Sequence, residues 1–126
     1  MADGRPRLVP DESHPITMAP AAATVRVHAG STVVADTERA LELREASYAP
    51  VFYVPIEDVD RRVLRDSELH TYCPYKGDAS YYGIVTEDLE VDNAVWTYRE
   101  PYDAVAVIAD HVAFYPHRVT VEVRPR

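Results

Sequence analysis

The chain is organised around one stretch, His70-Thr71-Tyr72-Cys73-Pro74-Tyr75-Lys76-Gly77-Asp78-Ala79-Ser80-Tyr81-Tyr82. Pro74 and Gly77 interrupt it, so its middle is predicted to be a turn, and a strand is predicted to follow at 79–86. The stretch holds the only cysteine of the chain and four of its nine tyrosines. A thiol, an amine, an imidazole and phenols lie this close together nowhere else in the sequence, so the search for a functional site starts here.

Strand patterns lie on both sides of this stretch. Val25 and Val27 alternate with polar residues, and after a turn at 29–31 the return strand of a hairpin is predicted at 32–36. Further strands are predicted at 41–44, 51–54, 89–91, 94–98 and 119–124. Asp103 is a good helix N-cap, which predicts one short C-terminal helix at about 103–111. The charged segment 56–66 is predicted to be a solvated connection, with one or two helical turns as the alternative. The pattern indicates a mainly β fold.

The chain is predicted to contain one domain, because 126 residues suffice for a single hydrophobic core. Residues 1–23 are rich in Pro, Ala and charge and show no period, which predicts an extended N-terminal arm. His14-Pro15-Ile16 within this arm could anchor it to the body. The domain itself is predicted to span 24–126.

Composition excludes several classes of function. The formal charge of −8 and the scatter of basic residues among acids argue against a nucleic-acid partner. The sequence shows no run of membrane length and no signal peptide, and a lone cysteine suits a reducing compartment, so we expect a cytoplasmic protein. The histidines are too far apart for a metal motif, and no P-loop or other cofactor motif occurs, so we expect neither metal nor cofactor. The acid pair Asp58-Val59-Asp60 resembles that of metal-dependent nucleotidyl transfer, but the Gly30-Ser31 pair that would accompany it lies on a separate hairpin at the wrong spacing.

Cys73 and Lys76 are the candidate catalytic residues. A nearby ammonium can activate a thiol, and Lys76 follows Cys73 by three residues, within reach across a tight turn. His70 would point to the opposite face of a strand from Cys73, which weakens it as a partner. The alternatives are a buried, inert cysteine and a solvated lysine in the turn.

Aromatic residues are more numerous than a small core needs. Tyrosine combines an apolar ring with a polar tip, and several that converge on one concavity would make an aromatic-walled ligand site. Alternation sends Tyr81 and Tyr82 to opposite faces, so only one of them can face that site. The predicted ligand-binding residues are Tyr53, Thr71, Tyr72, Lys76, Tyr81, Trp96 and Tyr98.

The central stretch also carries a family resemblance. Thr71-x-Cys73-Pro74-x-Lys76-Gly77-x-Ala79-x-Tyr81 resembles the signature of domain-of-unknown-function family 427, which is sometimes labelled a nucleotidyltransferase. Further matching pieces follow in the same order: His14-Pro15-Ile16, Val33-Val34-Ala35-Asp36, Val51-Phe52-Tyr53-Val54-Pro55, Asp92-Asn93-Ala94-Val95-Trp96-Thr97-Tyr98 and Ala113-Phe114-Tyr115-Pro116.

The resemblance implies a β-tent-like arrangement, in which two antiparallel sheets are pinned at one edge and open at the other. This fold group includes the ligand-binding domain of cereblon and methionine sulfoxide reductase B. Many of its members hold zinc at the pinned edge with two Cys-x-x-Cys pairs. This chain has one cysteine, so that zinc is not expected.

Three hypotheses for the function follow. The first is a small-molecule-binding protein with an aromatic-lined pocket around residues 70–82, at the open edge. The second is a small enzyme that uses the same pocket for a non-metal acid/base or thiol-assisted cyclisation, addition or isomerisation. The third is a structural or partner-binding domain. An unpaired sheet edge also leaves room for a homodimer.

Overall fold

The computed structural model describes residues 4–126, and in this range the chain is mainly β. The elements follow in the order β1 (Ile16–Pro20), β2 (Ala23–Ala29), β3 (Thr32–Thr37), β4 (Leu41–Glu45), β5 (Val51–Pro55), η1 (Ile56–Asp58), η2 (Arg61–Val63), β6 (Leu64–Cys73), β7 (Gly77–Val85), β8 (Glu90–Thr97), η3 (Asp103–Ile108), β9 (His111–Phe114) and β10 (Thr120–Pro125), where η marks a 3₁₀ helix.

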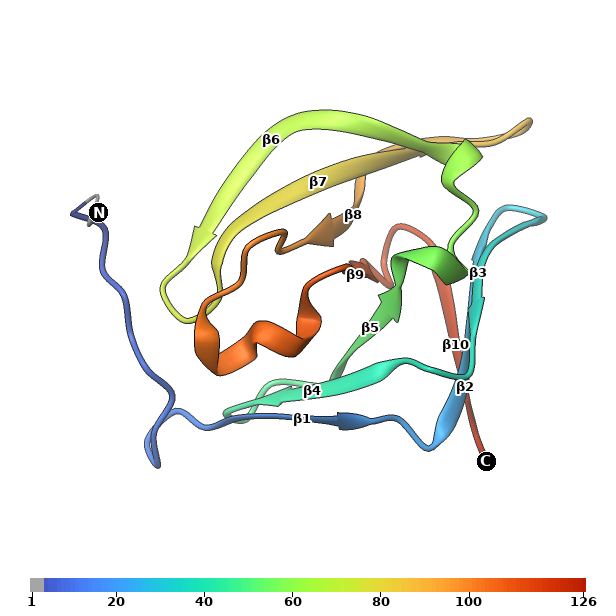
Figure 1. Ribbon diagram of the computed structural model, residues 1–126. Helices are drawn as coiled ribbons and strands as arrows, with labels where there is room; N and C mark the ends of the chain where they lie inside the picture. The colour runs from blue at the N-terminus through green and yellow to red at the C-terminus, as the bar shows by residue number, and fades with distance from the viewer. Residues whose placement is uncertain (1–3) are drawn as a thin grey trace.

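The strands form two antiparallel sheets. The larger has seven strands in the order β1-β4-β5-β9-β8-β7-β6, and the smaller has three in the order β10-β2-β3. Figure 1 shows that the large sheet curls from β6 and β7 at the top to β4 and β1 at the bottom, with η3 inside the curve and the small sheet at the right. These sheets confirm the predicted fold class.

The two sheets are joined along β3. Ala35 of β3 forms a β-bridge with Val59, and the amide of Asp60 donates to the carbonyl of Val34 at 2.8 Å. Towards β10 the sheets separate, and an apolar groove lies between them there. The β3 side is therefore the pinned edge and the β10 side the open edge of a tent.

Each face of the large sheet has its own core cluster. The first lies between the sheets and includes Val25, Val27 and Val34 from the small sheet with Val54 and Val95 from the large one. The second lies on the face covered by η3 and includes Leu43, Tyr53, Tyr81, Val105 and Ile108. Tyr53 and Val54 belong to different clusters because successive side chains of β5 point to opposite faces.

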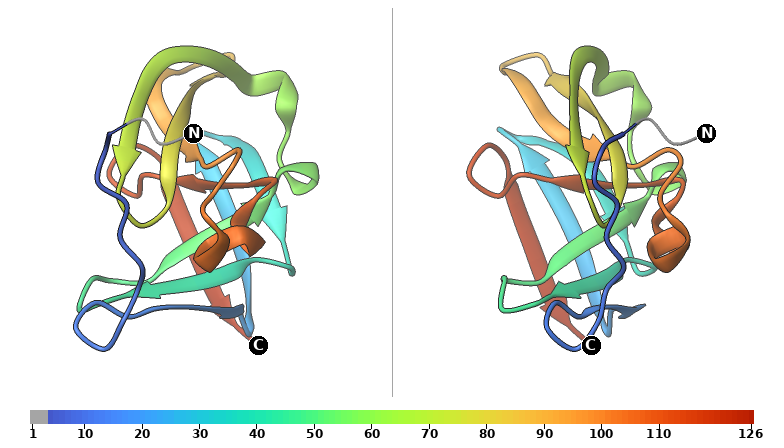
Figure 2. Two further views of the ribbon diagram at one scale, coloured as in Figure 1. Left: turned by 60° about the vertical axis from the view of Figure 1, so that its left-hand side comes forward. Right: turned by 90° about the vertical axis from the view of Figure 1, so that its left-hand side faces the viewer.

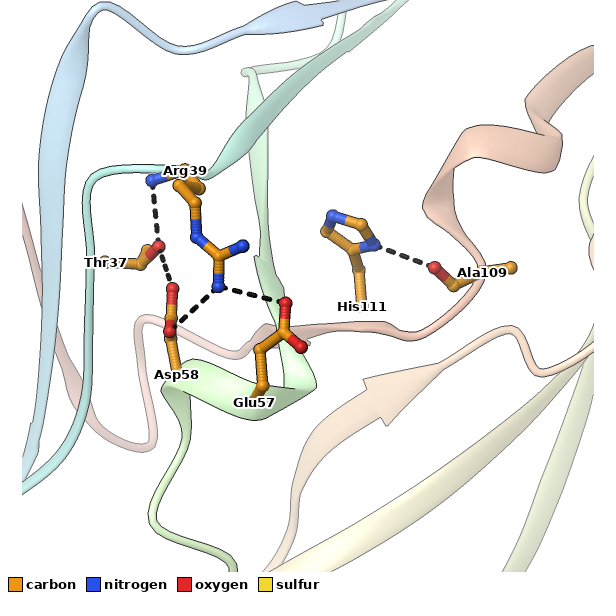
Figure 3. A network of polar contacts seen from close by, with 6 residues as sticks. All are labelled: Thr37, Arg39, Glu57, Asp58, Ala109 and His111. Carbon is orange, nitrogen blue, oxygen red and sulfur yellow. Dashed lines mark hydrogen bonds and ion pairs between the residues drawn. The ribbon is translucent and has the colours of Figure 1, made fainter.

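A polar network ties the pinned edge together (Figure 3). The buried Thr37 hydroxyl donates to Asp58 at 2.6 Å, and Arg39 donates to Asp58 at 3.1 Å and to Glu57 at 2.9 Å. Asp60 is held by Arg62 in the neighbouring turn, at 3.0 Å. The acid pair at residues 58 and 60 therefore fastens η1 and η2 in place.

Several details differ from the sequence-based expectation. The longest strand, β6, was not predicted, and it begins at Leu64, inside the segment 56–66 that the sequence analysis interprets as a connection. The segment 103–111 contains a 3₁₀ helix that ends at Ile108, and His111 already begins β9; Val105 has non-helical dihedral angles inside it, in keeping with the low helix propensity of valine. Within the expected arm, Ile16–Pro20 forms β1 and pairs with β4. Its part before β1 runs past the tip of the β6–β7 hairpin (Figure 2).

Among the described residues no helix is long and apolar enough to cross a membrane.

Candidate functional site

The β6–β7 hairpin positions Lys76. Its turn is closed by the Lys76 amide, which donates to the Cys73 carbonyl at 3.2 Å, and the Tyr102 amide donates to the Lys76 carbonyl at 3.0 Å. Gly77 has φ +104°, a conformation that side chains with a Cβ rarely adopt. The Lys76-Gly77 pair therefore turns the chain so that the lysine side chain points into the protein.

Lys76 is buried, with only 6% of its surface exposed, and it makes an ion pair with Glu45 at the end of β4. The other carboxylate oxygen of Glu45 lies 2.7 Å from Nε2 of His14. The His14 ring stacks on Tyr75, with 4.2 Å between the ring centroids. Three segments that are distant in sequence thus meet at one buried charge cluster.

The pKa of Glu45 lies below its ordinary value. Burial by itself raises this pKa, but the hydrogen bonds from Lys76 and His14 and their positive charges outweigh it. The Glu45 carboxylate is therefore ionised at neutral pH and balances the Lys76 ammonium.

The ion pair faces a cavity of about 300 Å³ on the face of the large sheet that η3 covers. We call it the aromatic cavity, because rings make up most of its wall. Its lining residues are Leu43, Glu45, Tyr48, Ala49, Val51, Tyr53, Lys76, Tyr81, Trp96, Tyr98 and Tyr115.

The rings of the cavity hold one another in place. Trp96 Nε1 donates to the Tyr53 hydroxyl at 3.3 Å, and the Trp96 and Tyr115 rings lie 4.4 Å apart. Burial raises the pKa of Tyr53 and of Tyr98, and burial together with a polar contact to Tyr81 raises that of Tyr115 to about 12. These phenols therefore stay protonated at neutral pH and can both donate and accept hydrogen bonds.

The cavity brings together Tyr53, Lys76, Tyr81, Trp96 and Tyr98, which are five of the predicted ligand-binding residues. This cavity does not lie at the open edge between the sheets, where the sequence analysis placed the pocket, but on the opposite face of β5; of the five residues, only Trp96 also borders the groove at the open edge.

The other predicted residues take different positions. Thr71 lies behind the wall, its hydroxyl 2.8 Å from that of Tyr81, and Cys73 lies beside it with Sγ 3.9 Å from Lys76 Nζ. Tyr72 points to the other face of the hairpin, where its hydroxyl lies 2.6 Å from that of Tyr102. His70 is exposed beside Ser80. Neither Thr71, Tyr72 nor Cys73 lines the cavity.

Sequence reasoning missed Glu45, His14 and Tyr115 as members of the site. Glu45 ends a strand with alternating charges, so it looks like one more solvated acid until tertiary structure places it beside Lys76. The composition did hold one indication of the site: Lys76 is the only lysine of the chain, which otherwise uses arginine, twelve times, as its basic residue. A single lysine in such a chain, directly before a turn glycine, is an unusual choice for a solvated surface position.

The site combines the ion pair of Lys76 and Glu45, several protonated phenols and flat apolar surfaces. Such a cavity can bind a polar molecule through both its hydrogen-bond donors and its acceptors. Within residues 4–126, no three His, Cys, Asp or Glu side chains gather where they could hold a metal ion.

Comparison with known proteins identifies the family of the chain. No curated protein matches the chain in sequence. A family model described as a domain of unknown function, DUF427, matches residues 17–125. This range contains β2 to β10, all of β1 except Ile16, and all lining residues of the aromatic cavity. The chain therefore belongs to the DUF427 family.

Proposed function

We propose that this protein binds a small molecule in the aromatic cavity, and that Lys76 and Glu45 provide its main polar contacts. The observation that carries the proposal is the ion pair of the buried Lys76 with the half-buried Glu45, which faces a cavity walled by aromatic rings. Concave apolar sites with a few convergent polar groups are the usual form of ligand pockets.

Stability alone is a poor reason for such a pair. Removing two charges from water costs free energy that their attraction often fails to return, and apolar residues of similar volume would frequently serve the fold better. Lys76 also lies beside the cavity, where ammonium hydrogens can reach a ligand. The ion pair is thus better explained by recognition than by packing.

The chemistry of the cavity favours an uncharged polar ligand with a flat ring. Because Glu45 already balances Lys76, a charged ligand would leave one buried charge unmatched. A group that accepts from Lys76 or a phenol and donates to Glu45 satisfies both partners. Trp96 and Tyr115 offer ring faces and edges for an aromatic ligand.

The test is a fragment screen followed by nuclear magnetic resonance. Protein labelled with ¹⁵N-lysine gives one backbone signal, from Lys76, and ¹⁵N-tryptophan gives the indole signal of Trp96. Uncharged aromatic fragments should shift both signals and bind at least tenfold more weakly to Lys76→Met and Glu45→Gln. Arg61→Met and Glu87→Gln, which change exposed residues, are matched controls and should bind normally. Fragments that bind all four variants equally, or that shift neither signal, would contradict the proposal.

A second candidate is an enzyme that performs acid/base or thiol-assisted chemistry in the same cavity. It is favoured by the 3.9 Å distance between Lys76 Nζ and Cys73 Sγ, which places an ammonium beside a thiol. If Lys76 activates the sulfur, iodoacetamide should label folded wild-type protein faster than Lys76→Met. Equal rates would leave Cys73 as a packing residue of the second core cluster.

We also propose a cytoplasmic location, since the lone cysteine is a free thiol and suits a reducing compartment. Fractionation of cells that produce the protein, followed by immunoblotting, tests this location. Recovery in a secreted or membrane fraction would exclude it.

A further inference from the structure

A second cavity lies at the open edge, between the two sheets. This apolar groove has a volume of about 340 Å³. Its walls include Val25 and Val27 of β2, Phe52 and Val54 of β5, and Val121 and Val123 of β10. The groove is lined largely by hydrocarbon, whereas the aromatic cavity on the other face of β5 contains the ion pair.

The two cavities meet where the large sheet is split. β5 pairs with β9 through Val54–Val112 and Pro55–His111, and the described residues show no further β5–β9 pair. From Tyr53 back to Val51 the two strands therefore diverge. Ala49, Val51 and Trp96 line both cavities. The Trp96 indole reaches across this split, since it donates to Tyr53 of β5 from its own position on β8.

We propose that the groove and the aromatic cavity are two compartments of one binding site, and that the ligand is an amphiphile whose polar ring lies beside Lys76 and Glu45 and whose hydrocarbon part lies in the groove. This inference rests on the proposed function, because it assigns the polar end to the same cavity. Two observations support this inference. The groove and the aromatic cavity share the lining residues Ala49, Val51 and Trp96, and the lining changes from polar in the aromatic cavity to apolar in the groove.

Chain length gives a quantitative expectation. Each methylene that leaves water for an apolar site contributes roughly 0.8 kcal/mol, which corresponds to about a fourfold gain in affinity. The gain should stop once the groove is filled. A ligand confined to the aromatic cavity would show a chain-length dependence that substitutions in the groove leave unchanged.

The probes are 4-alkylphenols from 4-methylphenol to 4-heptylphenol, whose hydroxyl both donates and accepts. Affinity is measured by isothermal titration calorimetry, with fluorescence of Trp96, the only tryptophan, as a second readout. Val123→Glu places a charge in the groove at a residue that is already 37% exposed, and Val121→Phe fills the groove without charge. Thr120→Glu, on the same strand but facing away from the groove, is the matched control. Thermal unfolding verifies that each variant is folded.

We expect wild type and Thr120→Glu to bind about fourfold more tightly per added methylene over several methylenes. In Val123→Glu and Val121→Phe this dependence should be lost, while 4-methylphenol binds as in wild type. Binding of short phenols without any dependence on chain length would overturn the inference and leave the proposed function intact.

Three other results would also overturn the inference. One is that the affinity of Val123→Glu and Val121→Phe depends on chain length as strongly as that of wild type. Another is tight binding of long phenols to Lys76→Met and Glu45→Gln, which would make the groove an independent site. The third is a dimer in sedimentation that Val123→Glu dissociates, which would make a second copy of the chain the occupant of the groove. If no phenol of any length binds, the amphiphile is excluded, and the fragment screen decides the proposed function separately.

Discussion

At the scale of single residues, the Lys76–Glu45 pair is the main charged contact of the aromatic cavity. Lys76→Met is expected to lower the free energy of unfolding by about 2–4 kcal/mol, because the half-buried Glu45 carboxylate loses its ammonium partner and keeps only its contact with His14. Urea unfolding followed by circular dichroism measures the change.

The double variant Lys76→Met/Glu45→Leu serves as its control. It removes both charges and should recover most of the loss, since an apolar pair needs no compensation. Arg61→Met, at an exposed arginine, should stay within about 0.5 kcal/mol of wild type. A double variant no more stable than Lys76→Met would show that the pair contributes through packing rather than charge.

The lowered pKa of Glu45 makes the stability of the fold depend on pH. A carboxyl whose pKa is lower in the folded than in the unfolded state stabilises the fold above its unfolded value of 4.5, and this contribution disappears as pH falls through the folded pKa. Wild type should therefore lose more stability than Glu45→Gln between about pH 5 and pH 3. Unfolding midpoints measured across this range test the difference, with Glu87→Gln as the exposed control; parallel curves for wild type and Glu45→Gln would refute it.

At the scale of secondary-structure elements, the pinned edge depends on one carboxylate. Asp58 accepts from the buried Thr37 hydroxyl and from Arg39, whereas the exposed Glu57 accepts from Arg39. Asp58→Ala should lower stability by about 1–2 kcal/mol, because it leaves Thr37 without its carboxylate partner. Glu57→Ala should cost less than about 0.5 kcal/mol. Thermal unfolding of the two variants measures the contrast, and equal losses would rule out the assigned role of Asp58.

The N-terminal segment before β1 supports the β6–β7 hairpin. The Tyr72 hydroxyl donates to the Pro6 carbonyl at 2.7 Å, and the Leu8 amide donates to the Pro74 carbonyl at 3.0 Å. Deleting residues 1–9 should speed amide hydrogen exchange at the hairpin tip by about fivefold, as expected for a local loss of roughly 1 kcal/mol. Exchange in β2 should stay unchanged and provides the internal control. Unaltered exchange at the tip would mean that the segment lies on the hairpin without stabilising it.

At the scale of the whole molecule, the strands that the sequence predicted are those whose side chains alternate clearly between apolar and polar. Alternation at Val25 and Val27 predicted β2, and alternation at Val121 and Val123 predicted β10, because the side-chain period of a strand is local. β1 was missed although Ile16 and Met18 also alternate, since the surrounding prolines and alanines conceal a short edge strand. The prediction of a helix at about 103–111 rested on Asp103 as its N-cap, but Tyr102 holds that position without a side-chain cap, and Val105 departs from helical geometry.

The site was harder to predict than the fold. The turn at Lys76 and Gly77 was visible locally, and five wall residues were named from their chemistry alone. Glu45 and His14 reach Lys76 only through the pairing of β4 with β1 and β5 and the curl of the large sheet. The choice of face for the cavity likewise follows from which side of β5 the helix η3 covers, which no local period encodes.

The separation of Glu45 and Lys76 along the chain also has a kinetic consequence. The two residues are 31 positions apart and belong to different hairpins, so their contact forms only after those hairpins dock. Contacts of this kind are usually incomplete in the transition state for folding. Lys76→Met should therefore accelerate unfolding strongly and slow refolding little, which stopped-flow rates across urea concentrations would reveal. The buried lysine of the aromatic cavity would then also set how long each molecule stays folded.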